Sequence, residues 1–224
     1  MTIDENKLIE SGLKHASEVA TKFLNTIFGD SAKECSGIVS DTVKFWRFKN
    51  QVNIIIKAKQ FLDEKGIAPG VVPAKTLMMI MEKAGLEDSP SIQEKWAALL
   101  ANAANPSHTK TILPSFVSIL SELSSLEVGI LDKTFQTASA IEKNKRFEFQ
   151  FSKQAFIQEF KITSDDFDVI SNNLMRLNIF APLASYGGMR AGEGNTTAPF
   201  VLRSDDLFHL TPLGYSFIEN CRRP

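Results

Sequence analysis

Hydrophobic residues recur at helical spacing along the first 28 residues of the chain. Their intervals of 4, 3, 4, 3 and 4 residues form the a/d seam of nearly three heptads. The seam positions are Ile9, Leu13, Ala16, Ala20, Phe23 and Ile27. Three interpretations stay open: a helix packed on its own domain, a helix for self-association or a protein partner, and a helix on a membrane surface. Acidic residues offset the lysines that anionic lipid attracts, which disfavours the third.

The same spacing predicts further helices up to residue 123. One covers about 40–65, a second starts at Pro73, a third follows the capping-box sequence S-I-Q-E at 91–94, and a fourth starts at Pro114. The methionines within 78–81 are assigned to core filling. Residues 29–123 therefore read as an all-helical bundle.

The pattern changes after Ser124, where period-two alternation appears beside helical spacing. The predicted elements are a helix through Ile130, Leu131 and Phe135, a strand at 147–151, helices capped by Ser152 and Thr163, strands at 179–183 and 199–203 with 207–210 pairing nearby, and a last helix started by Thr211 and Pro212. The order helix, strand, helix, helix, hairpin, helix is typical of a winged-helix domain.

These segments predict a mainly α (α+β) protein in which an N-terminal helical bundle precedes a C-terminal winged-helix domain. The expected parts are an amphipathic N-terminal helix at 1–28, a bundle domain at 29–123 and a winged-helix-like domain at 124–224.

A winged-helix domain suggests DNA binding, but the charges on the presumed recognition helix argue against sequence-specific DNA binding. The presumed recognition helix opens with Asp165, Asp166 and Asp168, which would face phosphates, whereas its only basic residue is Arg176. The remaining basic positions are scattered, the Arg222–Arg223 tail included. The candidate nucleic-acid contacts are Lys44, Arg47, Lys49, Arg176, Arg190 and Arg203.

Composition narrows the functional class further. The formal net charge of −1 gives the whole molecule no bias toward nucleic acid or acidic membrane. The longest apolar runs are too short to span a bilayer, and the polar, acidic N-terminus is unlike a signal peptide. Cys35 and Cys221 are the only cysteines and do not suggest a disulfide framework. A cytoplasmic location is expected.

Motifs that would carry chemistry are absent from the sequence. There is no HExxH or CxxC pattern, no Walker A loop and no GxSxG elbow, and the glycines within 187–194 belong to a hairpin tip. The three histidines lie far apart, and His209, in a strand, is expected to be a satisfied structural histidine. No catalytic, metal or cofactor-binding residue is assigned, no small-molecule substrate is identified, and the protein is expected not to be an enzyme.

Four segments together resemble the abortive infection alpha family of bacterial proteins. They are T-V-K-F-W-R-F-K-N-Q, L-E-D-S-P-S-I-Q-E-K-W-A-A-L-L-A-N-A, P-S-F-V-S-I-L-S-E-L-S-S-L-E and H-L-T-P-L-G-Y-S-F-I-E-N-C, in an order that covers about 29–221. The resemblance implies a role in defence against bacteriophage, in which infected cells cease growth before progeny are released. It brings no catalytic residues.

A non-enzymatic defence protein that acts through a protein partner or self-association is therefore the favoured hypothesis. A winged-helix transcriptional regulator is the alternative, and an effector that perturbs membranes through its first helix is a third. The phage trigger, the cellular target and the oligomeric state do not follow from the sequence.

Overall fold

The computed structural model describes residues 15–16, 18–27, 42–141, 149–186 and 201–224, and of 42–45, 183–186 and 201–206 the backbone alone. The chain divides into two compact units. Unit 1 comprises residues 1–125 together with 219–224, and unit 2 comprises 126–218. The bundle was expected to end at residue 123, two residues before this division. The second domain was expected to run to residue 224, whereas residues 219–224 lie with unit 1.

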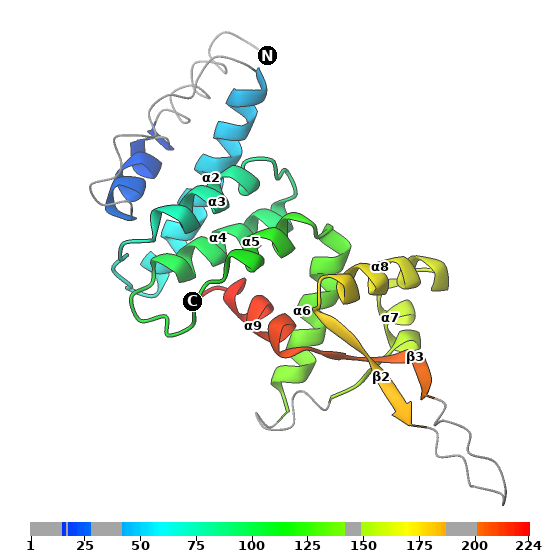
Figure 1. Cartoon of the computed structure of the whole chain (residues 1–224). Coiled ribbons are helices and arrows are strands. Elements are labelled where there is room, and N and C mark those ends of the chain that lie inside the picture. The colour runs from blue at the N-terminus through cyan, green and yellow to red at the C-terminus, as the bar shows by residue number, and fades with distance from the viewer. Residues whose placement is uncertain (1–14, 17, 28–41, 142–148, 187–200) are drawn as a thin grey trace, which may run out of the picture. The chain divides into compact units, whose positions relative to one another are not determined.

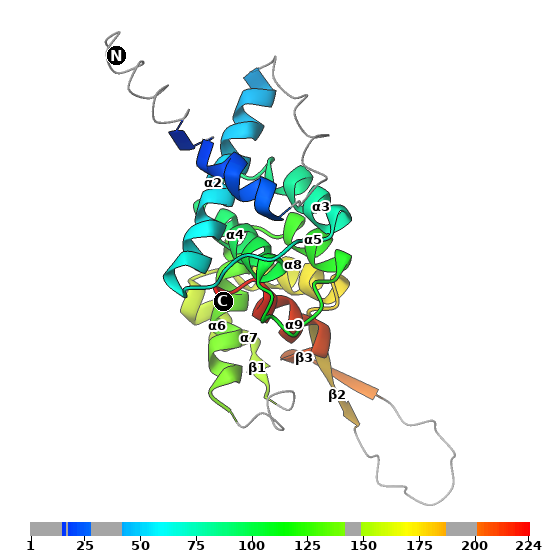
Figure 2. The same cartoon turned by 90° about the vertical axis from the view of Figure 1, so that its left-hand side faces the viewer.

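Unit 1 is built from helices packed around α4. Its elements are helical residues 15–16 and 18–27, α2 (Thr42–Glu64), α3 (Ala74–Ala84), α4 (Pro90–Ala104) and α5 (Pro114–Ser121). Helices α2 and α4 run side by side, as both views show (Figures 1 and 2). Proline fixes the first turn of α4 and of α5, because its backbone dihedral suits that position and its missing N–H needs no partner.

The core of unit 1 lies along α4, where apolar residues cover most of the helix circumference. Trp96, Leu99 and Leu100 are fully buried there. A helix that is apolar nearly all round must be surrounded by other elements, which explains its central position. The predicted S-I-Q-E capping box is wrong, because Pro90 moves the start of α4 forward and Ser89 becomes the N-cap residue.

The described part of the N-terminal seam is packed inside unit 1. Ala20, Phe23 and Ile27 are buried, and Ala16 is half-buried. The carbonyl of Ile27 accepts a hydrogen bond of 2.8 Å from the Val72 N–H. This burial supports the interpretation of a helix packed on its own domain.

The last residues of the chain are fastened to unit 1 by polar contacts. Asn102 is buried and donates both amide hydrogens, to the carbonyls of Asn220 and Arg222 at 2.8 Å each. Arg223 donates to Glu94 at 2.8 and 3.0 Å, and its guanidinium lies 4.4 Å from the centre of the Phe61 ring. The C-terminal end is thus part of the unit 1 fold.

Unit 2 contains a small antiparallel sheet and the helices around it. Its elements are α6 (Ser125–Ser139), β1 (Phe151–Ser152), α7 (Lys153–Phe160), α8 (Ser164–Arg176), β2 (Phe180–Tyr186), β3 (Val201–Leu210) and α9 (Pro212–Asn220). The sheet order is β1-β3-β2, and β2 and β3 form a two-stranded ribbon (Figure 1). The mainly α fold class with a small sheet is confirmed.

The strand predictions in unit 2 need three corrections. Strand β1 has only two residues, and its expected start at 147–148 lies outside the described residues. The expected segments 199–203 and 207–210 belong to one continuous strand, β3, although its predicted first two residues also lie outside the described part. Strand β2 runs on to Tyr186, and the pairing between β2 and β3 shifts register between Pro182 and Leu183. Proline has no N–H for the ladder, so an irregularity is expected beside it.

Phenylalanine rings fill the core of unit 2. Successive ring centres lie 5.5–6.4 Å apart, the usual separation of packed aromatic pairs. The rings come from β1, α7, α8, β2 and β3: Phe151, Phe156, Phe167, Phe180 and Phe208. Every element except α6 and α9 contributes a ring, so this cluster ties the sheet to α7 and α8.

Alanine substitutions at two glycines of unit 2 are expected to change its stability in opposite directions. A Cβ added at Gly214 in α9 would press against the Ile179 carbonyl oxygen and lie 2.9 Å from the Ile179 Cα, whereas one at Gly129 in α6 meets only Phe160 Cε1 at 3.6 Å. We expect Gly214→Ala to lower the free energy of unfolding by about 1–3 kcal/mol, and Gly129→Ala to raise it by about 0.5–1 kcal/mol. Denaturant titration measures both, and equal stabilities would contradict the close packing of α9.

Candidate functional site

The α7–α8 pair forms a helix-turn-helix whose ends are fixed by short polar residues. The N–H of Ala155 donates to the Ser152 hydroxyl at 3.2 Å and caps α7. Lys161, with φ of 52°, ends α7 in the left-handed conformation. Thr163 and Asp166 form a reciprocal capping box at the start of α8. Both predicted caps are confirmed.

The buried side of α8 sets which side faces solvent. Phe167, Ser171 and Leu174 are buried at intervals of four and three residues. This stripe packs into the phenylalanine cluster, since Phe167 lies 5.5 Å from both Phe156 and Phe208 between ring centres. The orientation of α8 within unit 2 therefore follows from its apolar spacing.

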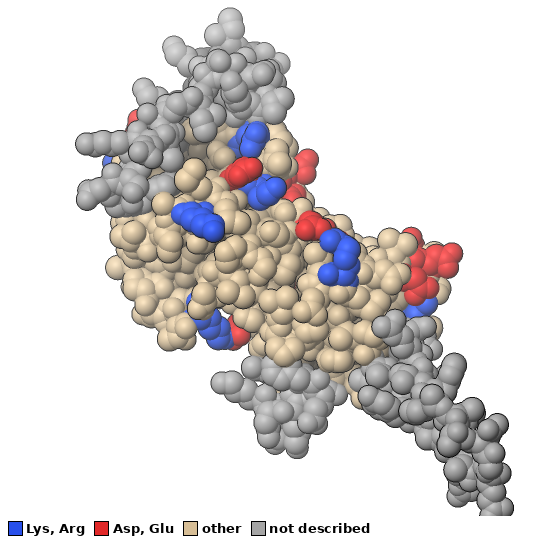
Figure 3. Space-filling view, in the orientation of Figure 1, with Lys and Arg blue, Asp and Glu red and all other residues tan. Residues whose placement is uncertain are grey.

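The opposite side of α8 is acidic and carries one exposed apolar residue. Asp165, Asp166 and Asp168 are exposed in its first turns, and Val169 beside them is 71% exposed. Figure 3 shows acidic side chains gathered at this end of α8. We call Asp165, Val169 and Asn172, which follow one another at helical spacing on this side, the α8 face.

Hydrogen bonds hold the carboxylate of Asp166 in its ionised form. The Thr163 hydroxyl donates to Asp166 Oδ2 at 2.7 Å and the Thr163 N–H donates at 3.3 Å. These bonds, the hydroxyl first, lower the pKa of Asp166 below its ordinary value. The first turn of α8 thus keeps its negative charge, which also complements the helix dipole.

Two basic residues around α8, Lys153 and Arg176, are engaged inside unit 2. Lys153 contacts Asp168 at 2.6 Å. Arg176 donates through Nε and Nη2 to Asn173 Oδ1 at 3.2 and 2.7 Å, while Asn173 donates to the buried carboxylate of Glu127 at 2.7 Å. The network joins the end of α8 to the start of α6, and Arg176 is not available as an unattached phosphate contact.

The candidate nucleic-acid contacts are not gathered into one surface. Lys49 is exposed and Arg47 half-buried on α2 of unit 1, whereas Arg176 lies on α8 of unit 2. Lys44 and Arg203 lie in α2 and β3, where only the backbone is described, and Arg190 lies outside the described residues.

The structure describes part of the predicted partner seam, and it shows what Arg223 of the arginine tail contacts. Ile9 and Leu13 lie outside the described residues, and the buried seam positions offer no surface in this conformation. In the tail, Arg223 contacts Glu94, Glu64 and Phe61. Its guanidinium is therefore already engaged within unit 1.

Two residues were misjudged or missed in the sequence. His209 is not satisfied as expected, because its Nδ1 is buried and has no hydrogen-bond partner among the residues that the structure describes. Val169 was not predicted to be a site residue, because its neighbours in the sequence are all compatible with an ordinary helix. The position two residues after the buried Phe167 points away from the core, and this was the signal that could have found it.

The described residues contain neither a metal-site grouping nor a membrane-spanning helix. No group of histidine, cysteine, aspartate and glutamate side chains within them has the arrangement of a metal site. None of the helices that the structure describes combines the length and apolar character needed to cross a membrane.

A comparison with protein-family models matches residues 49–221 to abortive infection alpha. The match covers well over half of the chain. The chain belongs to the abortive infection alpha family. No curated protein and no solved structure matches it.

Some of the candidate surfaces lie within the residues that match the abortive infection alpha family, and others lie outside them. The α8 face lies within the match, and so do α3 and the contact between Asn102 and Asn220. The N-terminal seam lies outside, as does most of the segment T-V-K-F-W-R-F-K-N-Q, which was expected to carry part of the resemblance.

The capping box predicts a pH dependence of folding. A carboxylate whose pKa is lowered by folding stabilises the fold above its unfolded-state pKa, and this contribution disappears as the pH falls through the folded-state pKa. The stability difference between wild type and Asp166→Asn should therefore be present at pH 7 and vanish in acid. Thr163→Ala should lower the free energy of unfolding by about 1 kcal/mol at pH 7.

Urea titrations between pH 2 and 7 measure both effects. The control is Asp165→Asn, which removes a neighbouring carboxylate that takes no part in the capping box. A pH-independent difference between wild type and Asp166→Asn would show that the carboxylate does not act through these hydrogen bonds.

Proposed function

We propose that this protein acts in abortive infection by binding a protein through the α8 face. Membership of the abortive infection alpha family supports the defence role. The observation that carries the binding mode is the exposed Val169 within an acidic turn on an otherwise well-packed unit. A solvent-exposed apolar side chain beside unneutralised charge suits a protein contact, in which both groups find partners.

The architecture of unit 2 supports its assignment as a winged-helix domain. The order α6, β1, α7, α8, β2, β3 places a helix-turn-helix between the first strand and the hairpin, and β1 pairs with β3 as the fold requires. In this proposal α8 occupies the position of the recognition helix, so the α8 face is the surface with which such domains make contacts.

Electrostatics separates protein binding from the alternative of a DNA-binding regulator. A recognition helix approaches base edges with its first turns. Here those turns carry Asp165, Asp166 and Asp168, and Arg176 at the far end is tied to Asn173. Phosphate repulsion at the contact point would remove the term that supplies most of the affinity of DNA-binding proteins.

The proposal includes a non-enzymatic action in the cytoplasm. No catalytic motif was identified in the sequence, and the only two cysteines are far apart, as in proteins of reducing compartments. Cys221 is buried and forms no disulfide within the described residues, which suits a reducing environment.

The test is a plaque assay on cells that express wild type or Val169→Lys. The variant places a cation in the acidic face without altering the core, so we expect normal folding, an unchanged melting temperature and lost protection. Gln158→Lys is the matched control, because it adds the same charge at an exposed position of the neighbouring helix α7. It should protect like wild type.

Two results would contradict this proposal. Full protection by Val169→Lys would exclude the α8 face, and a wild type that protects against none of a broad phage panel would remove the defence role. A mobility-shift assay with duplex DNA at physiological salt tests the alternative, since tight binding to one sequence would favour the DNA-binding regulator.

A further inference from the structure

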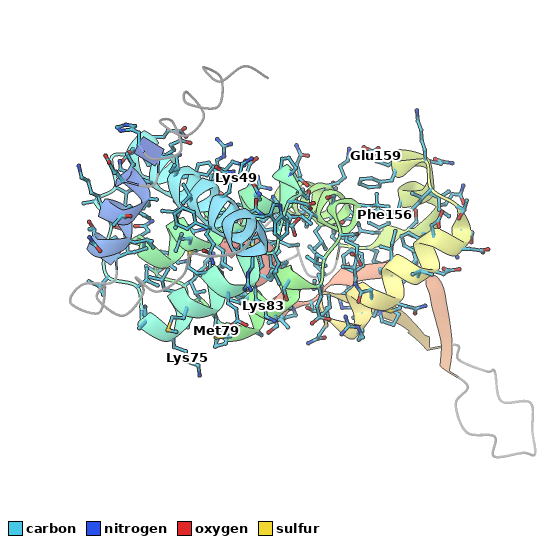
Figure 4. The ribbon with its side chains drawn as sticks, turned by 90° about the horizontal axis from the view of Figure 1, so that it is seen from above. Lys49, Lys75, Met79, Lys83, Phe156 and Glu159 are labelled. Atoms are coloured by element: carbon cyan, nitrogen blue, oxygen red, sulfur yellow. The ribbon has the colours of Figure 1, made fainter. Side chains whose placement is uncertain are left out.

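A basic stripe lies on the outer side of α3 in unit 1. Lys75, Met79 and Lys83 occur every four residues and follow one another along this helix (Figure 4). Both lysines are exposed, and neither has a carboxylate within ion-pair distance among the described residues. We call these three residues, together with the neighbouring Met78, the α3 stripe.

The methionines make the α3 stripe partly apolar. Met78 is 61% exposed, and Met79 is half-buried. The expectation that these methionines fill the core is therefore wrong for Met78, because the core side of α3 is already occupied by Leu77, Ile80 and Ala84. Exposed methionine adapts well to a partner surface, since its unbranched side chain adopts many shapes.

The backbone of α3 is held firmly from behind. Gln51 donates to the Met81 carbonyl at 2.8 Å, and the buried Asn50 donates to the Gly85 carbonyl at 3.4 Å. The Asn50 bond gives a partner to the Gly85 carbonyl just past the end of α3, and the Gln51 bond adds to the one that the Met81 carbonyl already accepts from the Gly85 N–H. The α3 stripe is a fixed platform whose side chains alone need to adjust.

The α3 stripe and the α8 face have matching spacing and opposite charge. Asp165 precedes Val169 by four residues, and Lys75 precedes Met79 by four, a separation of about 6 Å along a helix. Asp165 has no hydrogen bond or ion pair among the described residues. Each helix thus presents a charged residue and, four residues further on, an apolar side chain, which is exposed for Val169 and half-buried for Met79.

We propose that the α3 stripe binds the α8 face of a second copy of this chain. The inference rests on the proposed function of the α8 face and identifies its partner. Its basis is the complementarity of charge, since Lys75 meets the acidic first turn of α8, while Met78 and Met79 cover Val169.

Parallel helices satisfy the charges best. In that direction Asp165 faces Lys75 and Val169 faces Met79, and Glu82 lies opposite the neutral Asn172. In the antiparallel direction Asp165 faces Lys83, but Glu82 then lies opposite Asp166, which is repulsive. The parallel contact therefore pairs Asp165 with Lys75 and keeps Glu82 away from the acidic turn of α8.

This contact joins two different surfaces, so its geometry is heterologous. Two copies can exchange the contact reciprocally and form a closed dimer, or successive copies can extend an open assembly. A membrane surface fits the α3 stripe less well, because Glu82 lies among its lysines and would be repelled by anionic lipid.

Charge exchange tests the proposal on the full-length protein. Self-association is measured by sedimentation equilibrium over a range of concentrations and salt. Lys75→Glu with Lys83→Glu should weaken it about tenfold or more, and Asp165→Lys with Asn172→Lys should do the same, because each makes the contact repulsive. Mixing the two variants should restore association. Lys49→Glu, an exposed reversal on α2, is the control and should associate like wild type.

Several results would overturn the proposal. They are a wild type that stays monomeric at every concentration, a Lys75→Glu/Lys83→Glu variant that associates like wild type, a mixture that does not recover association, and binding to anionic phosphatidylserine vesicles that depends on Lys75 and Lys83. If the wild type is monomeric while Val169→Lys still abolishes protection, the α8 face binds a different protein. The proposed function then stands and the self-association falls.

Discussion

The burial of Phe167 against the other phenylalanine rings is the interaction on which the functional account depends. It is fully buried and lies 5.5 Å from Phe156 and Phe208, so it joins α8 to α7 and to the sheet. Because a helix is a rigid rod at this length, fixing one side fixes the other. The acidic turn and Val169 face solvent because Phe167 and Leu174 cannot.

The capping box and the Glu127 network then hold the two ends of α8. Thr163 and Asp166 satisfy N–H groups at the first turn, and Asn173 reaches the buried Glu127 near the last. A surface held at both ends loses little conformational freedom on binding, which favours recognition. The α3 stripe has the same property through Gln51 and Asn50, so both proposed contact surfaces are preorganised.

Helices and caps were predictable because their signals are local. Thr163, Ser152 and Pro114 act within one turn of their own position, and the structure places helix starts beside all three. Strand lengths were not, since the extent of β1 and β3 depends on pairing between segments more than 50 residues apart in the chain. The S-I-Q-E segment failed for a related reason: Pro90 offers an earlier start that a capping-box pattern does not weigh.

For the candidate site, too, the local features were predictable from the sequence and the features that depend on packing were not. The acidity of α8 was visible in the sequence, but the exposure of Val169 depends on which side of α8 the phenylalanine core covers. The contacts of Asn102 with Asn220 and Arg222 join residues about 120 positions apart and leave no local trace.

Photo-crosslinking from position 169 tests the central claim most directly. A photoreactive amino acid replaces Val169 in the full-length protein, and infected cells are irradiated. The account predicts an adduct with a protein, identified as a second copy of this chain, and no such adduct from a photoreactive residue at Gln158. An adduct with nucleic acid, or no adduct from position 169 under conditions in which the cells resist phage, would contradict it.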